Sequence, residues 1–132
     1  MTFGVPAYAK ATRWVAAAHV FALVVQLLLA ITFVSGLGAA YPYHANTAWL
    51  VFALGVLQAG LMFNPALPRV HGMYLVFAAL IALGEAAELF VVPRGQAAVH
   101  VTVAVLVWGL SVALYVRLLA PDWVDSTFPT GD

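Results

Sequence analysis

Four histidines, His19, His44, His71 and His100, are the residues of this 132-residue chain best suited to chemistry. A neutral imidazole nitrogen can ligate haem iron, and two imidazoles on different helices can reach the iron from both faces of the macrocycle. The chain has no cysteine, which excludes disulfides, thiolate metal sites and iron–sulfur clusters. It also lacks a di-iron carboxylate–histidine motif, so we assign no ligands of a bare metal ion, and haem b is the cofactor that the residues favour.

The histidines form two pairs according to their expected depth in a membrane. His44 lies at the mouth of the second apolar segment and His100 about one turn into the fourth, so at a rise of 1.5 Å per residue their depths should agree closely. His19 and His71 form a weaker pair, because His19 lies deeper in its segment than His71. We therefore predict that any bound cofactor is a haem b with His44 and His100 as axial ligands. The alternative is that no cofactor is bound and the histidines are interfacial.

Glu85 and Glu88 are the only acidic residues within a predicted membrane-spanning segment. Glu85 lies about 10 Å inside the end of that segment, and an ionisable group at this depth indicates a functional site and should face the interior of the bundle. With His44 and His100, the glutamates could form a proton relay, a divalent-metal site or the polar wall of a quinol pocket. The alternative is structural, with Glu85 hydrogen-bonded to a neighbouring helix and Glu88 reaching water.

Two glutamines, Gln26 and Gln58, lie deep in the first and second apolar segments. A side-chain amide in such a place costs free energy unless its polar atoms are paired. We expect a structural role for both, in which they bond to each other or to backbone carbonyls. Such bonds would hold the first two helices together by about 0.6 kcal/mol or somewhat more.

The composition identifies the elements that must position these side chains. Hydrophobic residues make up 65% of the chain and charged residues 8%, with a mean hydropathy of +1.03, whereas soluble domains carry roughly 25% charged residues. We predict one transmembrane domain over residues 1–132, because a span needs about 20 apolar residues. Backbone groups in lipid must pair within their own segment, so the spans must be helices. The predicted spans are about residues 14–36, 47–63, 70–92 and 97–119.

The basic residues predict the orientation of the chain. Lys10, Arg13, Arg69 and Arg117 fall on one side of the four predicted spans and Arg94 on the other. By the positive-inside rule, both termini are then cytoplasmic. With short connections, the predicted fold class is an all-α membrane protein, an up-down-up-down bundle of four transmembrane helices in a lipid bilayer.

Small residues predict where the helices pack, since helices in lipid associate through close contact. Gly55 and Ala59 stand four residues apart in the second span, and Ala78, Ala82 and Ala86 repeat at the same interval in the third. Both sets should face neighbouring helices.

The arrangement of Gln26 in an alanine-rich first span, His44 before the second and His100 opening the fourth resembles a family of small four-helix bacterial membrane proteins of unknown function. The resemblance covers about residues 14–119 and rests on single polar residues. It implies a multi-pass protein of the bacterial inner membrane and no particular activity.

More distantly, the placement of His44 and His100 is similar to that in four-helix b-type cytochromes, such as cytochrome b561 and the halves of haem A synthase. This similarity implies haem b binding and electron transfer. Those proteins hold their ligands within helices, whereas here we expect residues 41–47 to form a loop, with Asn46 or Thr47 capping the second helix.

Three classes of function follow from these residues. The first is a haem-binding or quinol-linked electron-transfer subunit that uses His44 and His100. The second is a non-catalytic accessory subunit of a larger membrane complex or a homo-oligomer. The third is a small transporter or channel subunit with Glu85 as its ion site, which ranks last because the two halves show no inverted repeat.

Other classes find no support in the sequence. It contains no phosphate loop, dinucleotide fingerprint or nucleophile elbow, and whether the chain is an enzyme stays open. Its net charge of zero gives no indication of nucleic-acid binding.

Overall fold

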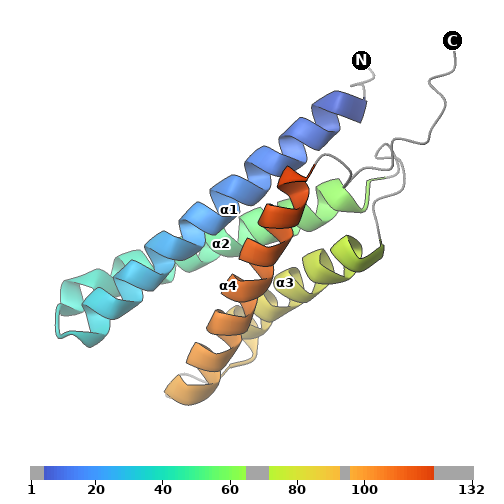
Figure 1. The fold of residues 1–132 in the computed structure, drawn as a ribbon. Helices are drawn as coiled ribbons and strands as arrows, with labels where there is room; N and C mark the ends of the chain where they lie inside the picture. The colour runs from blue at the N-terminus through green and yellow to red at the C-terminus, as the bar shows by residue number, and fades with distance from the viewer. Residues whose placement is uncertain (1–4, 65–71, 93–95, 121–132) are drawn as a thin grey trace, which may run out of the picture.

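The computed structural model describes residues 5–64, 72–92 and 96–120 and consists of helices (Figure 1). The helices are α1 (Val5–Val34), the short 3₁₀ helix η1 (Gly38–Ala40), α2 (Tyr41–Met62), α3 (Gly72–Phe90) and α4 (Ala97–Leu119). The four α-helices are all long and apolar enough to cross a membrane. The prediction of an all-α chain with four membrane-spanning helices is confirmed at this level, and the chain is that of a multi-pass membrane protein.

Each α-helix packs against two others. Helices that follow each other in the chain are in contact, and α4 returns to contact α1 (Figure 1). Near the start of α1, the Nε–H of Arg13 donates to the carbonyl oxygen of Leu118 near the end of α4, at 2.7 Å. This bond satisfies a carbonyl that the last turn of α4 leaves without a helical partner. The beginning of α1 and the end of α4 are therefore fastened together.

Two helices begin earlier than the apolar segments predict. α1 begins at Val5 rather than near residue 14, and α2 begins at Tyr41 rather than near residue 47. The predicted loop over 41–47 is wrong, because Pro42 is in the first turn of α2, where its missing N–H breaks no helical bond. His44 consequently lies in a helix. The chain reverses before this point at Gly36, whose φ of 97° favours glycine.

The other two helices lie close to their predicted spans. α4 has the predicted bounds of 97–119, and α3 covers residues 72–90 of the span predicted at 70–92. Residues 65–71, which include Arg69 and His71, and residues 93–95, which include Arg94, lie outside the described part of the chain.

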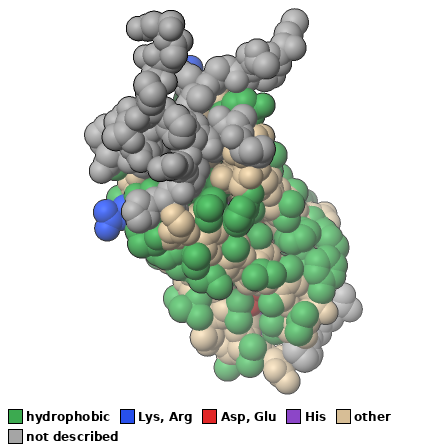
Figure 2. All heavy atoms as spheres, turned by 90° about the vertical axis from the view of Figure 1, so that its right-hand side faces the viewer, with side chains coloured by type: hydrophobic (Ala, Val, Ile, Leu, Met, Phe, Trp, Pro, Cys, Tyr) green, Lys and Arg blue, Asp and Glu red, His purple; other side chains and the backbone are tan. Residues whose placement is uncertain are grey.

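The surface of the bundle is apolar and its interior holds polar groups. Figure 2 shows apolar side chains over the body of the bundle, and the basic side chains that it colours lie toward one end. Large exposed apolar residues occur on every α-helix, among them Phe21, Trp49, Leu83 and Val105. Within the described part of the chain, the buried polar residues are Thr12, His19, Gln58, Glu85 and Ser111. This distribution suits a solvent of lipid, where polar groups gather between helices.

Small residues allow the helices to approach closely, as predicted. Gly55 on α2 is buried against the carboxyl group of Glu85 on α3, and a Cβ atom at this position would overlap that group. Ala78 on α3 is also buried, while Ala82 and Ala86 are partly buried. The close approach at Gly55 positions the most deeply buried acidic residue of the described chain.

Candidate functional site: a buried triad beside an apolar cavity

Two clusters of polar side chains lie between the helices. We call His19, Gln58 and Glu85 the buried triad, and His44 and His100 the cavity histidines. The triad joins α1, α2 and α3 in the core, whereas the cavity histidines come from the first turns of α2 and α4. Both clusters adjoin one cavity.

The buried triad is centred on the imidazole of His19. Its Nδ1–H donates to Oε1 of Gln58 at 3.2 Å, and its Nε2 lies 2.5 Å from Oε1 of Glu85. The exposed fractions of the three residues are 0% for His19, 2% for Gln58 and 5% for Glu85. Both ring nitrogens therefore have partners, and three helices are joined through a single side chain.

The bonding of His19 determines how many protons the triad holds. The amide oxygen of Gln58 only accepts hydrogen bonds, so Nδ1 of His19 carries a hydrogen. The short contact between Nε2 and the Glu85 carboxyl then contains one further proton, on either the nitrogen or the oxygen. In both arrangements the pair of His19 and Glu85 has zero net charge. A neutral pair is far cheaper to bury than an isolated ion.

The second carboxyl oxygen of Glu85 is not used by the triad. Oε2 is buried and has no hydrogen-bond partner within the described residues, and it packs against the backbone at Gly55. Glu85 also contributes to the wall of the cavity. An unpaired buried oxygen of this kind is costly in a low-dielectric interior. It is therefore a natural position for an additional proton or a ligand hydrogen bond.

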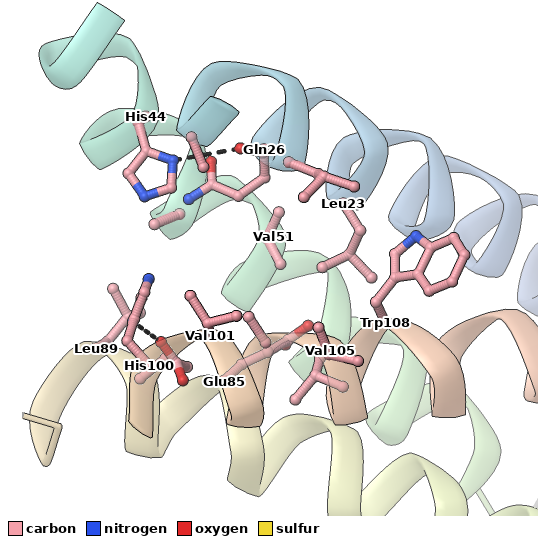
Figure 3. A pocket seen from close by; sticks show the side chains of 16 residues that line it. Leu23, Gln26, His44, Val51, Glu85, Leu89, His100, Val101, Val105 and Trp108 are labelled. Atoms are coloured by element: carbon pink, nitrogen blue, oxygen red, sulfur yellow. Dashed lines mark hydrogen bonds and ion pairs between the residues drawn. The ribbon is translucent and has the colours of Figure 1, made fainter. Parts of the chain in front are cut away.

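The cavity has a volume of about 390 Å³ and receives side chains from all four α-helices. In Figure 3, α1 and α2 form one wall and α3 and α4 the opposite wall. The lining is largely apolar, which with this volume is typical of small-molecule and cofactor sites of about 300–1,000 Å³. Some of the lining side chains on α1 and α4 are exposed, so the cavity opens between these two helices. The exposed lining residues are Leu27, Val101, Val105 and Trp108.

The cavity histidines face each other across this space. Their ring centroids are 6.4 Å apart, and the ring planes make an angle of 78°. Figure 3 shows the rings on opposite walls, with a nitrogen of each directed into the gap between them. His44 is partly buried, and the His100 side chain has an exposed fraction of 46%.

Each cavity histidine has an acceptor at its Nδ1 atom. The Nδ1–H of His44 donates to the backbone carbonyl of Gln26 at 3.3 Å, and Nδ1 of His100 contacts Oε2 of Glu88. Histidines that ligate metals usually hold their second ring nitrogen in this way, against a backbone carbonyl or a carboxylate. The arrangement leaves both Nε2 atoms available to a ligand in the cavity.

The glutamines are held differently from the prediction. Gln58 accepts the bond from His19, and the side chain of Gln26 pairs with the hydroxyl of Thr47. These partners differ from the expected ones, and bonds of the two amides to each other or to backbone carbonyls stay a prediction. The broader expectation was that they fasten the first two helices together, and both bonds do join α1 to α2.

The remaining site residues fall into three groups. His44, His100 and Glu88 are brought together at the mouth of the cavity, while Glu85 is buried, as expected, but pairs with His19. His71 lies outside the described residues, so the weaker pair of His19 and His71 stays a prediction. Within the described ranges, no cluster of three or more histidine, cysteine or acidic side chains could hold a metal ion.

Comparisons with protein-family models, with curated proteins and with solved structures gave no match for this chain. The resemblance to small bacterial membrane proteins and to b-type cytochromes accordingly stays a prediction.

Proposed function

We propose that this protein binds haem b and carries electrons in the bacterial inner membrane, with His44 and His100 as the axial ligands. The observation that supports this most strongly is the relation between the two rings. An iron held by two coaxial imidazoles, at metal–nitrogen distances of about 2 Å, places the ring centroids roughly 6 to 6.5 Å apart. The observed separation is 6.4 Å.

The shape and lining of the cavity also support a flat macrocycle. The space lies between the wall of α1 and α2 and the wall of α3 and α4, so each histidine approaches from a different face (Figure 3). One helical turn beyond His44 and His100 are Ala48 and Ala104, whose small side chains leave room beside the imidazoles. The apolar walls would exclude water from both faces.

Haem would supply a one-electron carrier, and the chain would supply its ligands and their orientation. His44 is oriented by the Gln26 carbonyl and His100 by the Glu88 carboxylate. These contacts fix which nitrogen of each ring carries hydrogen and direct the other into the cavity. A binding site with its ligands already oriented loses less entropy when it is filled.

We further propose the up-down-up-down topology with both termini in the cytoplasm. The Arg13–Leu118 bond supports it, because it brings the start of the first helix to the end of the fourth. The adjacency of His44 and His100 supports it as well, since both lie in first turns. In this orientation the haem site lies in the outer half of the membrane, away from the basic residues Lys10 and Arg13.

A visible spectrum of the detergent-purified protein, reduced minus oxidised, tests the haem proposal. The full-length protein with haem should give the low-spin spectrum of bis-histidine ligation. His44→Ala and His100→Ala should each abolish it, whereas Thr102→Ala, an exposed position on α4 outside the cavity, should not change it. A low-spin spectrum that survives in both histidine variants would refute the assignment. A protein that takes up no haem would favour the accessory-subunit alternative.

A further inference from the structure

We infer that Glu85 takes up one proton when an electron enters the cavity site, so that the protein couples electron transfer to proton uptake. This inference rests on the proposed haem function and adds a second activity to it. It is carried by the contacts of the buried triad and by the position of Glu85 between that triad and the cavity.

The triad provides a place for one more proton. His19 and Glu85 already share one proton in their Nε2–Oε1 contact, and the bond to Gln58 occupies the other ring nitrogen. The only atom of the pair without a hydrogen-bond partner is Oε2 of Glu85. Protonation there would leave the contact with His19 in place and change the net charge of the pair from zero to one positive charge.

The cavity provides the reason for that proton to bind. An electron added to haem iron brings one negative charge into a site with apolar walls, where charges interact more strongly than in water. Glu85 lines the same cavity, so a positive charge on its pair with His19 would offset the electron. With haem bound, the step would balance: the haem iron would take one electron from the reductant, Glu85 would take one proton from the buffer to form an O–H bond at Oε2, and no other covalent bond would change.

Other titratable groups adjoin the cavity, and their contacts differ from those of Glu85. His44 on α2 and His100 on α4 are the proposed iron ligands, and Glu88, one turn further along α3, is paired with His100. From α1, the group that reaches Glu85 is His19 itself. Glu88 also has a buried oxygen without a hydrogen-bond partner, Oε1, but its other oxygen contacts a proposed iron ligand. Glu85 differs because it is bonded to the buried His19, which has no proposed ligand role.

Redox titration of the haem-loaded full-length protein, with dithionite as the reductant, tests the inference. Between about pH 6 and pH 8 the midpoint potential should fall by about 59 mV per pH unit, the value for one proton per electron. The sign follows because a lower proton concentration disfavours the protonated, reduced form. Glu85→Gln should keep the low-spin spectrum and lose the pH dependence. Ser111→Ala, a buried change on α4 whose hydroxyl already donates to its own helix, should keep both.

The outcomes separate this inference from the haem proposal. A low-spin haem whose potential does not change with pH would overturn proton coupling alone, as would a pH dependence that persists in Glu85→Gln. The absence of any haem spectrum would overturn both. If Glu85→Gln fails to fold, the infrared difference spectrum of the wild-type protein decides instead. Reduction should then produce a new protonated-carboxyl band or shift an existing one, and an unchanged protonated-carboxyl region would refute the inference.

Discussion

The buried triad and the cavity histidines are built from the same residue types, yet they differ in how fully their polar atoms are paired. Both nitrogens of His19 have protein partners, whereas His44 and His100 each have an acceptor at Nδ1 and a second nitrogen directed into the cavity. Exposure follows the same order, from 0% for His19 to 46% for His100. A fully paired imidazole stabilises the helices that it joins, while a half-paired one is available to an incoming ligand.

The difference also indicates where the bundle tolerates change. Truncating one member of the triad would leave its partner buried without a bond, in a place that water cannot easily reach. Truncating a cavity histidine would enlarge a space that is already open at one edge. Stability should therefore depend on the triad, and binding on the cavity histidines.

The largest effect that we predict is the loss of stability when His19 is replaced. His19→Ala should lower the free energy of unfolding by about 3–5 kcal/mol, because it leaves the Glu85 carboxyl buried and unpaired. His44→Ala, measured without haem, should cost less than about 1.5 kcal/mol, since it removes one partly exposed hydrogen bond. Equilibrium unfolding in mixed micelles would measure both. Equal costs for the two variants would contradict the distinction between the clusters.

A double replacement makes the same comparison sharper. His19→Leu combined with Glu85→Leu should be more stable than His19→Ala alone, because no polar group is then left buried without a partner. The opposite order would mean that His19 contributes through its volume rather than through its bonds.

An intermediate effect is expected at Gly55, which lies against Glu85. Gly55→Ala should destabilise the protein by about 1–3 kcal/mol, since the added methyl group must displace the carboxyl group or separate α2 from α3. Gly60→Ala is the matched control, because Gly60 lies on the same helix with open space around it. The same unfolding assay applies. A Gly55→Ala protein as stable as the Gly60→Ala protein would show that the helices do not approach as described.

The smallest effect concerns Glu88, which orients one cavity histidine. Glu88→Gln should weaken haem binding about tenfold and leave the free energy of unfolding nearly unchanged, because it alters the second partner of His100 rather than a ligand. Haem titration followed by absorbance would measure the affinity. Complete loss of binding would instead make Glu88 essential to the site, and an unchanged affinity would mean that it does not orient His100.

The sequence predicts the helices well where composition alone determines them. Four apolar segments in a chain with few charges must be helices in lipid, and α4 has the predicted bounds. The predicted starts of α1 and α2 were wrong because hydropathy shows where the apolar residues begin, whereas a helix can also include the polar residues before them. Lys10 and Arg13 are good helix formers, and Pro42 is compatible with a first turn.

The candidate site was predictable in part for a related reason. His44 and His100 both stand near the start of a helix, so counting residues gives their relative depth. The depth of His19 was counted from a start near residue 14, which placed it near one end of the first span. In the structure α1 begins at Val5, so His19 lies near the middle of that helix and meets Glu85. The sequence did contain one signal for the contact of His19 with Glu85. An acidic residue this deep in a span requires a partner at its own depth.

The bond between Arg13 and Leu118 holds one end of α4, so a small rotation of the helix about this end would move its other end the most. It fastens α4 to α1 at one end, while the cavity separates the two helices toward the other end, where His100 stands. His100 and Leu118 are eighteen residue steps apart, a distance of about 27 Å along the axis. A rotation of α4 by only about 2° around the fastened end would move His100 by about 1 Å, half the length of a metal–ligand bond. An angular adjustment too small to disturb the packing near Leu118 would thus be enough to set the spacing of the two imidazoles.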